Sequence, residues 1–540
     1  MRKKLQEIQI IWFLVTAVFI GFLVYPILQV FFRSLRTEEG IGFFHYIDVF
    51  AQGGFWQALA NSFLIAGISA ALTAVLAFIL AYTINMTNVH PWLKKMISLA
   101  ATLPMLLPTI TYGFAIIYSF GRQGLITRLL GRQIFQIYGF TGMLIGYVIY
   151  TLPVAFLLIN NTFRYIDKKY TVVSRIMGDR PVKTFWITII RPLAGTLGAS
   201  FIQAFFLSFT DYGIPAAVGG EFHVVASILY NEMLGAIPNF PNGAVVAIVM
   251  LLPSVISICV LNYLDRYNIR YSKISIMEIP KGRIRDAVLG MGSMCICAGT
   301  LSIFAVIFVI PFVEEWPYTL KFSFSKFVET IQGANLAMVY ENSIIVAVLT
   351  SCVGTVMAYG AALVTARSGL NKKLKSAIDM AALVTNTIPG MVLGIAFLFA
   401  FTGTPVHNTF FIIIICNVVH FFSTPYLMMK NSLEKMNSSW ETTAMLMGDS
   451  WLKTIMRVVT PNAGPTILEV FGYYFINSMV TISAVIFIAG ARTMVITTKI
   501  KELQHFAKFD EIFVLSLLIL ATNLAVKGIL KLMNGKRRKS

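Results

Sequence analysis

Charged residues are scarce in this chain. Only 12% of its 540 residues are Asp, Glu, Lys or Arg, whereas 57% are hydrophobic. The mean hydropathy is +0.76, far above that of an ordinary soluble domain. A chain with so few charges cannot cover its surface with polar groups, so the composition excludes a water-soluble globule. We expect the lipid bilayer to be its solvent, with helices of about 20 apolar residues as the spanning elements.

Acidic residues are especially few. The chain has 24 Asp and Glu against 43 Lys and Arg, a net charge of +19, and such a balance is also found in nucleic-acid-binding proteins. Once the spans are drawn, however, 32 of the 43 basic residues fall in loops and tails on one side. This asymmetry follows the positive-inside rule. It predicts a multi-pass protein of the cell (inner or plasma) membrane with both termini cytoplasmic, attracted to membrane lipid and without a nucleic-acid partner.

One outside loop departs from this asymmetry. Residues 121–138 carry Arg122, Arg128 and Arg132, although the loop is predicted to lie outside. A re-entrant or surface helix is the alternative to a plain loop, and the sequence assigns the segment no role.

Chemical motifs are equally sparse. All five cysteines fall within predicted spans, and none has metal-ligand spacing to a histidine, so we interpret them as small apolar residues. The chain has no Gly-x-x-x-x-Gly-Lys-Ser/Thr phosphate loop, so it is not expected to bind ATP itself. No paired carboxylates converge at one depth. We therefore predict no cofactor, no metal and no enzyme activity, with any ATP hydrolysis carried out by partner subunits.

Long uncharged runs are what the sequence has in abundance. Each is long enough to cross a bilayer as a helix, so the fold class is predicted to be an all-α polytopic membrane protein of about 12 transmembrane helices. The runs lie near residues 10–32, 62–84, 96–120, 139–160, 193–212, 242–264, 287–313, 342–365, 379–402, 409–429, 463–490 and 512–530.

Short motifs recur at fixed offsets. One offset is 281 residues, and it relates Asn61-Ser62 to Asn342-Ser343, Pro108 to Pro389 and Gly113 to Gly394. The other is 270 residues, and it relates MGDRPVKT at 177–184 to MGDSWLKT at 447–454. The eleven-residue difference predicts a longer loop between the third and fourth spans. We expect two six-helix repeats, 1–270 and 271–540, which are parallel because six is an even number of crossings.

Proline and glycine interrupt the third span of each half. They occur in LPMLLPTITYG at 103–113 and in TIPGMVLG at 387–394. Interrupted helices at corresponding positions point to a translocation route between the halves, although simple kinking is the alternative. A carboxylate at the end of the fifth span is either part of this route or merely interfacial. The candidate pathway residues are Pro108, Gly113, Asp211, Pro389 and Gly394.

A glycine-centred loop follows the fourth span of each half. The loops, 170–192 and 440–461, both read as helix, glycine, second helix and proline. Gly178 and Gly448 would form the turn, and Asp179 and Asp449 would cap the helix that follows. A short exposed helix on a fixed turn is suited to docking another protein.

This loop resembles the EAA loop of binding-protein-dependent ABC importer permeases. The second copy keeps the spacing, because Pro461 lies thirteen residues after Gly448, with Glu441 just before the Glu-Ala-Ala positions. The first copy departs, with Val172-Val173-Ser174 at those positions and Pro192 one residue late. The resemblance implies a type I (MetI-like) fold with both permease halves fused, in which each loop docks on an ATPase subunit. The implied contact residues are Arg175, Met177, Gly178, Asp179, Glu441, Met445, Met447, Gly448 and Asp449.

The same resemblance implies the partners and the function. The partners are two copies of a cytoplasmic ABC ATPase and an external solute-binding protein, and the function is import of a small solute. The stretch from 211 to 233 is similar to fused permeases assigned to 2-aminoethylphosphonate, and more distantly to those for ferric iron, thiamine and polyamines. An ion-coupled secondary carrier is the competing class, but the segment NMTNVHPWLKKM at 85–96 lacks the glycine-rich charged pattern that such carriers show.

Overall fold

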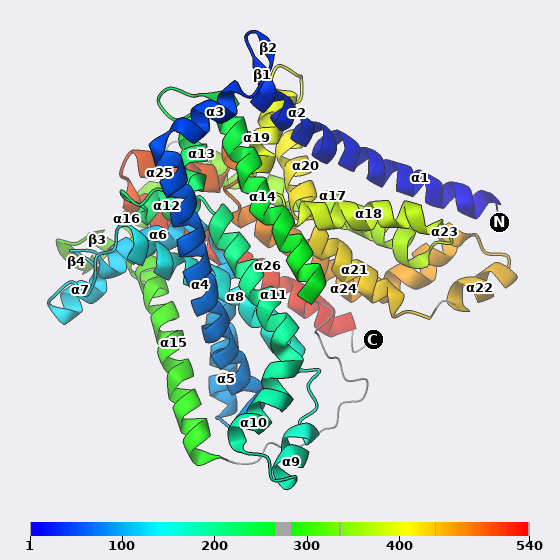
Figure 1. The fold of residues 1–540 in the computed structure, drawn as a ribbon, viewed down its shortest axis with the longest axis horizontal. Coiled ribbons are helices and arrows are strands. Elements are labelled where there is room, and N and C mark those ends of the chain that lie inside the picture. Colours follow the sequence, from blue (N-terminus) through cyan, green and yellow to red (C-terminus); the bar gives the residue numbers. More distant parts are fainter. Residues whose placement is uncertain (1, 265–281, 334–335, 438, 538–540) are drawn as a thin grey trace.

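The structure is a computed structural model that describes residues 2–264, 282–333, 336–437 and 439–537. Helices dominate it (Figure 1), as predicted for an all-α membrane protein. Two antiparallel hairpins accompany them, β1 (Arg36–Thr37) with β2 (Gly40–Ile41) and β3 (Val313–Glu315) with β4 (Thr319–Phe322). The predicted boundary between 270 and 271 lies outside the described residues.

The helices of the first half alternate between long spans and short connecting pieces. In chain order they are α1 (Arg2–Phe19), α2 (Tyr25–Leu35), α3 (Phe44–Ala51), α4 (Gly53–Met86), α5 (Pro91–Thr102), α6 (Thr109–Phe120), α7 (Leu125–Leu130), α8 (Phe140–Phe163), α9 (Lys169–Ile176), α10 (Pro181–Phe185), α11 (Arg191–Thr210), α12 (Gly213–Val218), α13 (Val225–Leu234) and α14 (Phe240–Leu264).

The second half repeats this order with small departures. Its helices are α15 (Arg283–Val309), α16 (Ser325–Gln332), α17 (Leu336–Arg367), α18 (Lys372–Thr385), α19 (Gly390–Phe401), α20 (Phe410–His420), α21 (Ser423–Glu434), α22 (Ser439–Leu446), α23 (Trp451–Thr454), α24 (Thr460–Val480), α25 (Ile496–His505) and α26 (Phe509–Arg537). π-helical turns at Trp186–Ile190 and Ile455–Val459 precede α11 and α24. Residues 121–139 separate α6 from α8, against 402–409 between α19 and α20, which confirms the predicted eleven-residue insertion.

The spans are less regular than the sequence predicts. Among the described residues, eight helical segments are long and apolar enough to cross a membrane, and three bent pairs raise the number to as many as eleven. The bends are 113° between α5 and α6, 108° between α18 and α19 and 56° between α20 and α21. The predicted spans at 96–120 and 379–402 are thus interrupted, as their proline and glycine residues indicate, whereas the bend in the span at 409–429 was not predicted. The span at 463–490 is also corrected, because α24 ends at Val480 and the segment is not among the eleven.

Proline explains the breaks in the third span of each half. Pro108 and Pro389 lie just before α6 and α19 with ψ angles of 146° and 139°, outside the helical region. A proline also removes one backbone donor and pushes the residue before it toward extended structure. The prolines therefore correctly predicted that both helices are interrupted, although they do not reveal that the chain turns by more than 100° at each break.

The duplicated Asn-Ser pair makes the same contacts in both halves. Asn61 donates to the carbonyl of His223 at 3.0 Å, and Ser62 accepts the N–H of Val225 at 2.9 Å. In the second half Asn342 donates to the Met494 carbonyl at 3.0 Å, and Ser343 accepts the N–H of Ile496 at 2.7 Å. The pair thus fixes the start of α13 to α4 and the start of α25 to α17.

The first helix of each half packs on the other half. α1 contacts α17, α18 and α23, and the indole N–H of Trp12 donates to the Leu374 carbonyl at 2.9 Å. Reciprocally, α15 contacts α4, α5 and α6. The halves are therefore interlocked rather than merely joined by the connecting segment.

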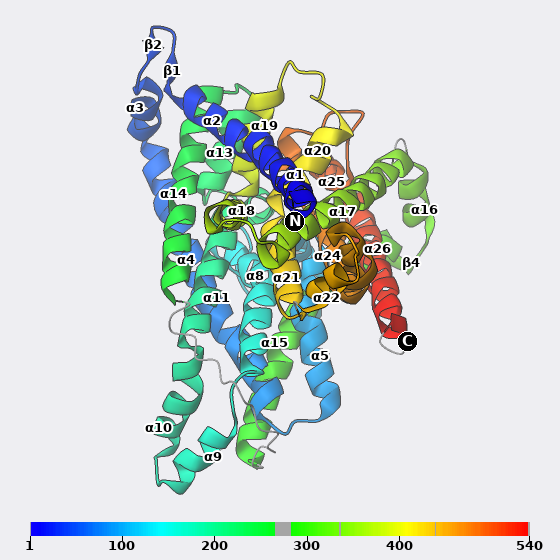
Figure 2. The same ribbon diagram turned by 90° about the vertical axis from the view of Figure 1, so that its right-hand side faces the viewer.

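The short elements are segregated to opposite sides of the molecule. In Figure 1 the two hairpins lie at the top and left edges, whereas α9–α10 and α22–α23 lie at the bottom and right, the side that also carries both chain ends. Figure 2 shows α9 and α10 at the bottom and the β1–β2 hairpin at the opposite end. The two glycine-centred loops, the start of α1 and the end of α26 thus all lie away from the two hairpins in these views.

Candidate coupling loops and pathway

The two glycine-centred turns have the same backbone geometry. Gly178 and Gly448 adopt φ angles of +82° and +83°. The N–H of Asp179 donates to the Ser174 carbonyl at 3.1 Å, and that of Asp449 donates to the Ala444 carbonyl at 2.9 Å. This is the Schellman arrangement that ends a helix on a left-handed residue. A Cβ would meet nothing within 4 Å at either glycine, so the conformation alone demands glycine there.

The aspartates do not cap the following helices, which corrects that prediction. Arg180 is the N-cap of α10 without a side-chain hydrogen bond, and Ser450 caps α23. Instead, Asp179 pairs with Lys183 at 2.6 Å, and Asp449 pairs with Lys453. The hydrogen bonds from Lys183 and Ser174 lower the pKa of the Asp179 carboxyl. In the second loop the Ser450 hydroxyl already accepts the N–H of Lys453 at 3.3 Å.

Apolar side chains are exposed at the tips of both loops. Ile176 and Met177 are 80% and 78% exposed, and Leu446 and Met447 are 85% and 80% exposed. Arg175 is exposed beside the first pair, whereas the side chain of Met445 lies outside the described part of the structure. Matched apolar pairs projecting from two copies of one turn form a surface suited to a protein partner.

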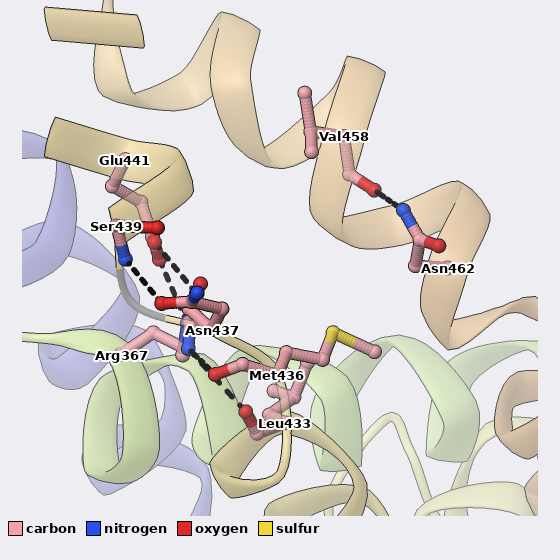
Figure 3. Close-up of polar contacts among 8 residues, drawn as sticks. All are labelled: Arg367, Leu433, Met436, Asn437, Ser439, Glu441, Val458 and Asn462. Carbon is pink, nitrogen blue, oxygen red and sulfur yellow. Dashed lines mark hydrogen bonds and ion pairs between the residues drawn. The ribbon is translucent and has the colours of Figure 1, made fainter. Parts of the chain in front are cut away.

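Glu441 lies inside the protein. Its carboxylate accepts hydrogen bonds from Nε and Nη2 of Arg367 at 2.7 and 2.5 Å (Figure 3), and the two side chains are only 9% and 4% exposed. Arg367 also donates to the carbonyls of Met436 at 2.7 Å and Asn437 at 3.1 Å. Because Arg367 ends α17 and Glu441 lies in the first turn of α22, this pair joins a span to the start of the second coupling loop.

A local hydrogen bond also holds the start of α22. The side-chain oxygen of Asn437 accepts the N–H of Ser439 at 2.9 Å (Figure 3). Further along the loop, Asn462 donates to the Val458 carbonyl at 2.7 Å, within the helical stretch that leads into α24. Hydrogen bonds therefore hold the loop in place both before and after Gly448.

The predicted pathway residues form one cluster in each half. In the first, a Cβ on Gly113 would lie 2.3 Å from the Cβ of Ala217, so α6 packs directly on α12. Asp211 is 7% exposed and accepts the N–H of Ile214 at 2.9 Å, which begins α12 beside the break at Pro108. The carboxylate thus has a structural partner at the start of α12, and its place in the translocation route stays a prediction.

The second cluster repeats the first. A Cβ on Gly394 would lie 2.3 Å from the carbonyl oxygen of Ala484, so α19 packs on the irregular segment after α24. In both halves the helix that follows the proline break therefore lies against the chain that follows the fifth span. The two glycines are required by this close approach.

The comparisons with known proteins bear on these paired features. The family model described as "binding-protein-dependent transport system inner membrane component" matches residues 73–269 and again 354–539. The matches begin 281 residues apart and end 270 apart, which are the two offsets of the motifs. Together they cover more than half of the chain.

The chain belongs to this family.

Similar proteins agree with this membership. The permease is 24% identical over 507 residues to the "Ferric transport system permease protein FbpB" of Actinobacillus pleuropneumoniae, covering 89% of this chain and 71% of that one. It is 21% identical over 407 residues to the "Fe(3+)-transport system permease protein FbpB 2" of Haemophilus influenzae, covering 74% of each. A 161-residue stretch is 29% identical to the "Molybdenum transport system permease protein ModB" of Mycobacterium tuberculosis, covering 29% of this chain and 60% of that one.

Family membership confirms the coarse predictions. The permease is a multi-pass membrane protein with two fused copies of the type I ABC permease unit, and it is a transporter subunit and not an enzyme. The family works with an ATPase and a binding protein. The predicted 2-aminoethylphosphonate specificity is not supported by these relatives, which are named for ferric iron and other solutes.

Among the contacts that sequence reasoning missed, two lie close to the predicted sites of the permease. Arg367 was not singled out, although it is the charged residue that closes a long apolar span. The second is a contact between halves: Gln504 donates to the Ala216 carbonyl at 2.6 Å, and the Lys501 ammonium lies 5.4 and 5.1 Å from the ring centroids of Tyr212 and Tyr230. The contact could not be predicted because Gln504 and Ala216 are 288 residues apart in the sequence.

The basic loop 121–138 contains one short helix, α7. Its α7 is a short surface helix, with Leu129 78% exposed. Arg128 donates to the Pro317 carbonyl at 2.5 Å and lies 5.9 Å from the Trp316 ring centroid. The insertion of the first half therefore touches the β3–β4 hairpin of the second.

Proposed function

We propose that the permease couples ATP hydrolysis to solute import through its two glycine-centred loops, each of which docks on one copy of a cytoplasmic ATPase. The observation that carries the proposal is the pair of matched tips, Ile176-Met177 and Leu446-Met447, on identical turns. Because each chain has two such tips, it binds two ATPase copies. The loops and both termini then face the cytoplasm, and the hairpins face the external binding protein.

The geometry supplies a mechanical route for this coupling. When the ATPases close on ATP, they pull the two loops together. The second loop is tied to α17 by Arg367 and Glu441, so its displacement moves a span. The proline breaks at Pro108 and Pro389, with Gly113, Gly394 and Asp211 nearby, would line the route that opens between the halves. Solute released by the binding protein would enter there, and hydrolysis would return the loops.

The test is ATP hydrolysis by the reconstituted complex. The double variant Met177→Asp/Met447→Asp places charge on both tips and should abolish the stimulation of hydrolysis by loaded binding protein. Ile284→Asp is the matched control, since Ile284 is 83% exposed and lies at the start of α15. Undiminished stimulation in the double variant would overturn the docking role.

For the solute, we propose ferric iron as cargo. Two relatives that match over most of this chain carry that name. The similarity of residues 211–233 to 2-aminoethylphosphonate permeases favours the second candidate. Proteoliposomes with the cognate ATPase and binding protein should accumulate ferric iron in an ATP-dependent manner. Accumulation of 2-aminoethylphosphonate instead would reverse the cargo assignment and leave the importer role intact.

A further inference from the structure

A cavity lies behind the first coupling loop. Its volume is about 120 Å³, well above the 10–15 Å³ or so that one water molecule needs. It lies between the end of α4, the helices α9 and α10 with the π-helical turn after them, and the start of α15. The lining residues are Tyr82, Met86, Lys168, Thr171, Arg175, Pro181, Thr184, Phe185, Thr188, Ile189 and Arg285.

The cavity occupies the place that a buried ion pair fills in the second half. Arg367 is the last residue of α17, and the residue 281 positions earlier is Met86, the last residue of α4. Glu441 lies in α22, and the residue 270 positions earlier is Thr171 in α9. Met86 and Thr171 both line the cavity. The first half therefore lacks the guanidinium and the carboxylate at this position and has a space instead.

The charge around the space is positive. Lys168, Arg175 and Arg285 line it, and no carboxylate is among the lining residues in the part of the chain that the structure describes. Arg285 pairs with the neighbouring Asp286 at 2.7 Å, so two of the three cations remain in excess over this carboxylate. At the offset of 270, Lys168 corresponds to Ser438 and Arg175 to Met445. The two cations that the first coupling loop contributes to the lining therefore have no charged counterpart in the second loop.

Hydroxyl groups complete the lining. Thr171 and Thr188 lie with their oxygens 3.2 Å apart, and Thr188 donates to the Thr184 carbonyl at 2.7 Å. The positive side chains are the groups that would bind an oxyanion, and the threonine hydroxyls, which are bonded within the protein, make the rest of the wall polar. Phosphate or carboxylate groups are of a size that fits the cavity.

We propose that this cavity is an oxyanion site, occupied by a phosphate or carboxylate group that does for the first coupling loop what Glu441 does for the second. The anion bridges α9 to the start of α15 through Lys168, Arg175 and Arg285. Its source is either a free anion or the phosphate of a lipid headgroup. Anion binding stands independently of the transport function, and only its consequence for coupling rests on the proposed function.

The test is thermal unfolding of the purified full-length chain in detergent, titrated with inorganic phosphate against chloride at constant ionic strength. Phosphate should raise the Tm with a saturable dependence. The double variant Lys168→Gln/Arg175→Gln should lose the shift. Arg457→Gln, which removes an exposed cation from the π-helical turn of the second half, should keep it. A shift that survives in the double variant contradicts the site.

A second variant tests the symmetry argument. Met86→Arg/Thr171→Glu installs the ion pair of the second half in the first. It should raise the Tm without added anion and should no longer respond to phosphate. If its response equals that of the natural chain, the cavity is not where the anion binds.

Lipid nanodiscs distinguish the two sources. If a headgroup phosphate fills the site, the Tm of the natural chain rises in nanodiscs containing phosphatidylglycerol relative to phosphatidylcholine alone, and Lys168→Gln/Arg175→Gln removes the difference. If the source is a free anion, only added phosphate acts. The absence of both responses overturns the proposal, and neither readout requires ATPase or transport activity.

Discussion

Arg367 donates two hydrogen bonds to the carboxylate of Glu441, at 2.7 and 2.5 Å, although the two residues are 74 positions apart in the sequence. Such a two-point contact between a guanidinium and a carboxylate restricts their relative orientation as well as their distance. The pair therefore fixes the start of α22 relative to the end of α17 in both distance and rotation. Movement of the second coupling loop is transmitted to that span.

Removing one partner of this pair should be costly. Glu441→Thr alone leaves a buried guanidinium without its carboxylate, which costs about 3–5 kcal/mol of stability. Arg367→Met alone leaves the carboxylate, with a loss of similar size. The double variant Arg367→Met/Glu441→Thr reproduces the residues of the first half and removes both charges, so it should be less destabilised than the sum of the single variants. Unfolding of the four proteins in one detergent measures this, and strict additivity would contradict the contact.

The left-handed turns predict a backbone effect. Gly178→Ala and Gly448→Ala should each destabilise the loop by about 1–2 kcal/mol, although open space surrounds both positions. Gly292→Ala is the control, since Gly292 is helical in α15 and a Cβ there also meets nothing within 4 Å. We expect the stimulation of ATP hydrolysis to be reduced in the loop variants and unchanged in the control. If all three variants show the same stability and the same ATPase stimulation, the left-handed conformation is not the reason for glycine at these positions.

The close approach in the pathway clusters predicts a steric effect instead. Gly113→Ala and Gly394→Ala place a methyl group 2.3 Å from the Ala217 Cβ and the Ala484 oxygen, which should cost about 1–3 kcal/mol. Gly299→Ala, in open space on α15, is the matched control. Lowered thermal stability of the two cluster variants relative to this control is the expected result. Full stability would mean that these helices do not pack as described.

The duplicated serines predict matching losses in the two halves. Ser62→Ala and Ser343→Ala each leave a buried backbone N–H, at Val225 or Ile496, without its acceptor. An unsatisfied buried donor costs about 1–3 kcal/mol. Hydrogen exchange at the start of α13 and α25 should accelerate in the respective variants. Ser302→Ala, at a partly exposed serine that donates to the local Gly299 carbonyl, should change neither.

Much of the fold could be predicted from the sequence because it depends on local chemistry. Apolar runs located the spans, and the offsets of 281 and 270 located the repeat. The pattern Met-Gly-Asp placed a left-handed glycine at 178 and 448. Proline at 108 and 389 marked the breaks. Each signal is set by a residue and its immediate neighbours.

Contacts between distant residues could not be predicted in the same way. Nothing local distinguishes Arg367 from other basic residues that follow a span, and its partner is fixed only when α17 and α22 meet. The assignment of Asp179 and Asp449 as caps failed because Lys183 and Lys453, one turn ahead, compete for the same carboxylates. The bend angles of 113° and 108° were also not predicted, because a proline marks where a helix breaks and not the direction of the helix that follows.

Cross-linking of the coupling tips to the ATPase tests the central claim most directly. In a background without the five natural cysteines, Met177→Cys and Met447→Cys would each be paired with cysteines introduced on the partner ATPase, with Ile284→Cys as the control. We predict that each tip forms a cross-link to one ATPase copy, that the double variant captures two copies per chain, and that ATP changes the yield. Yields at both tips no higher than at residue 284 would contradict the account.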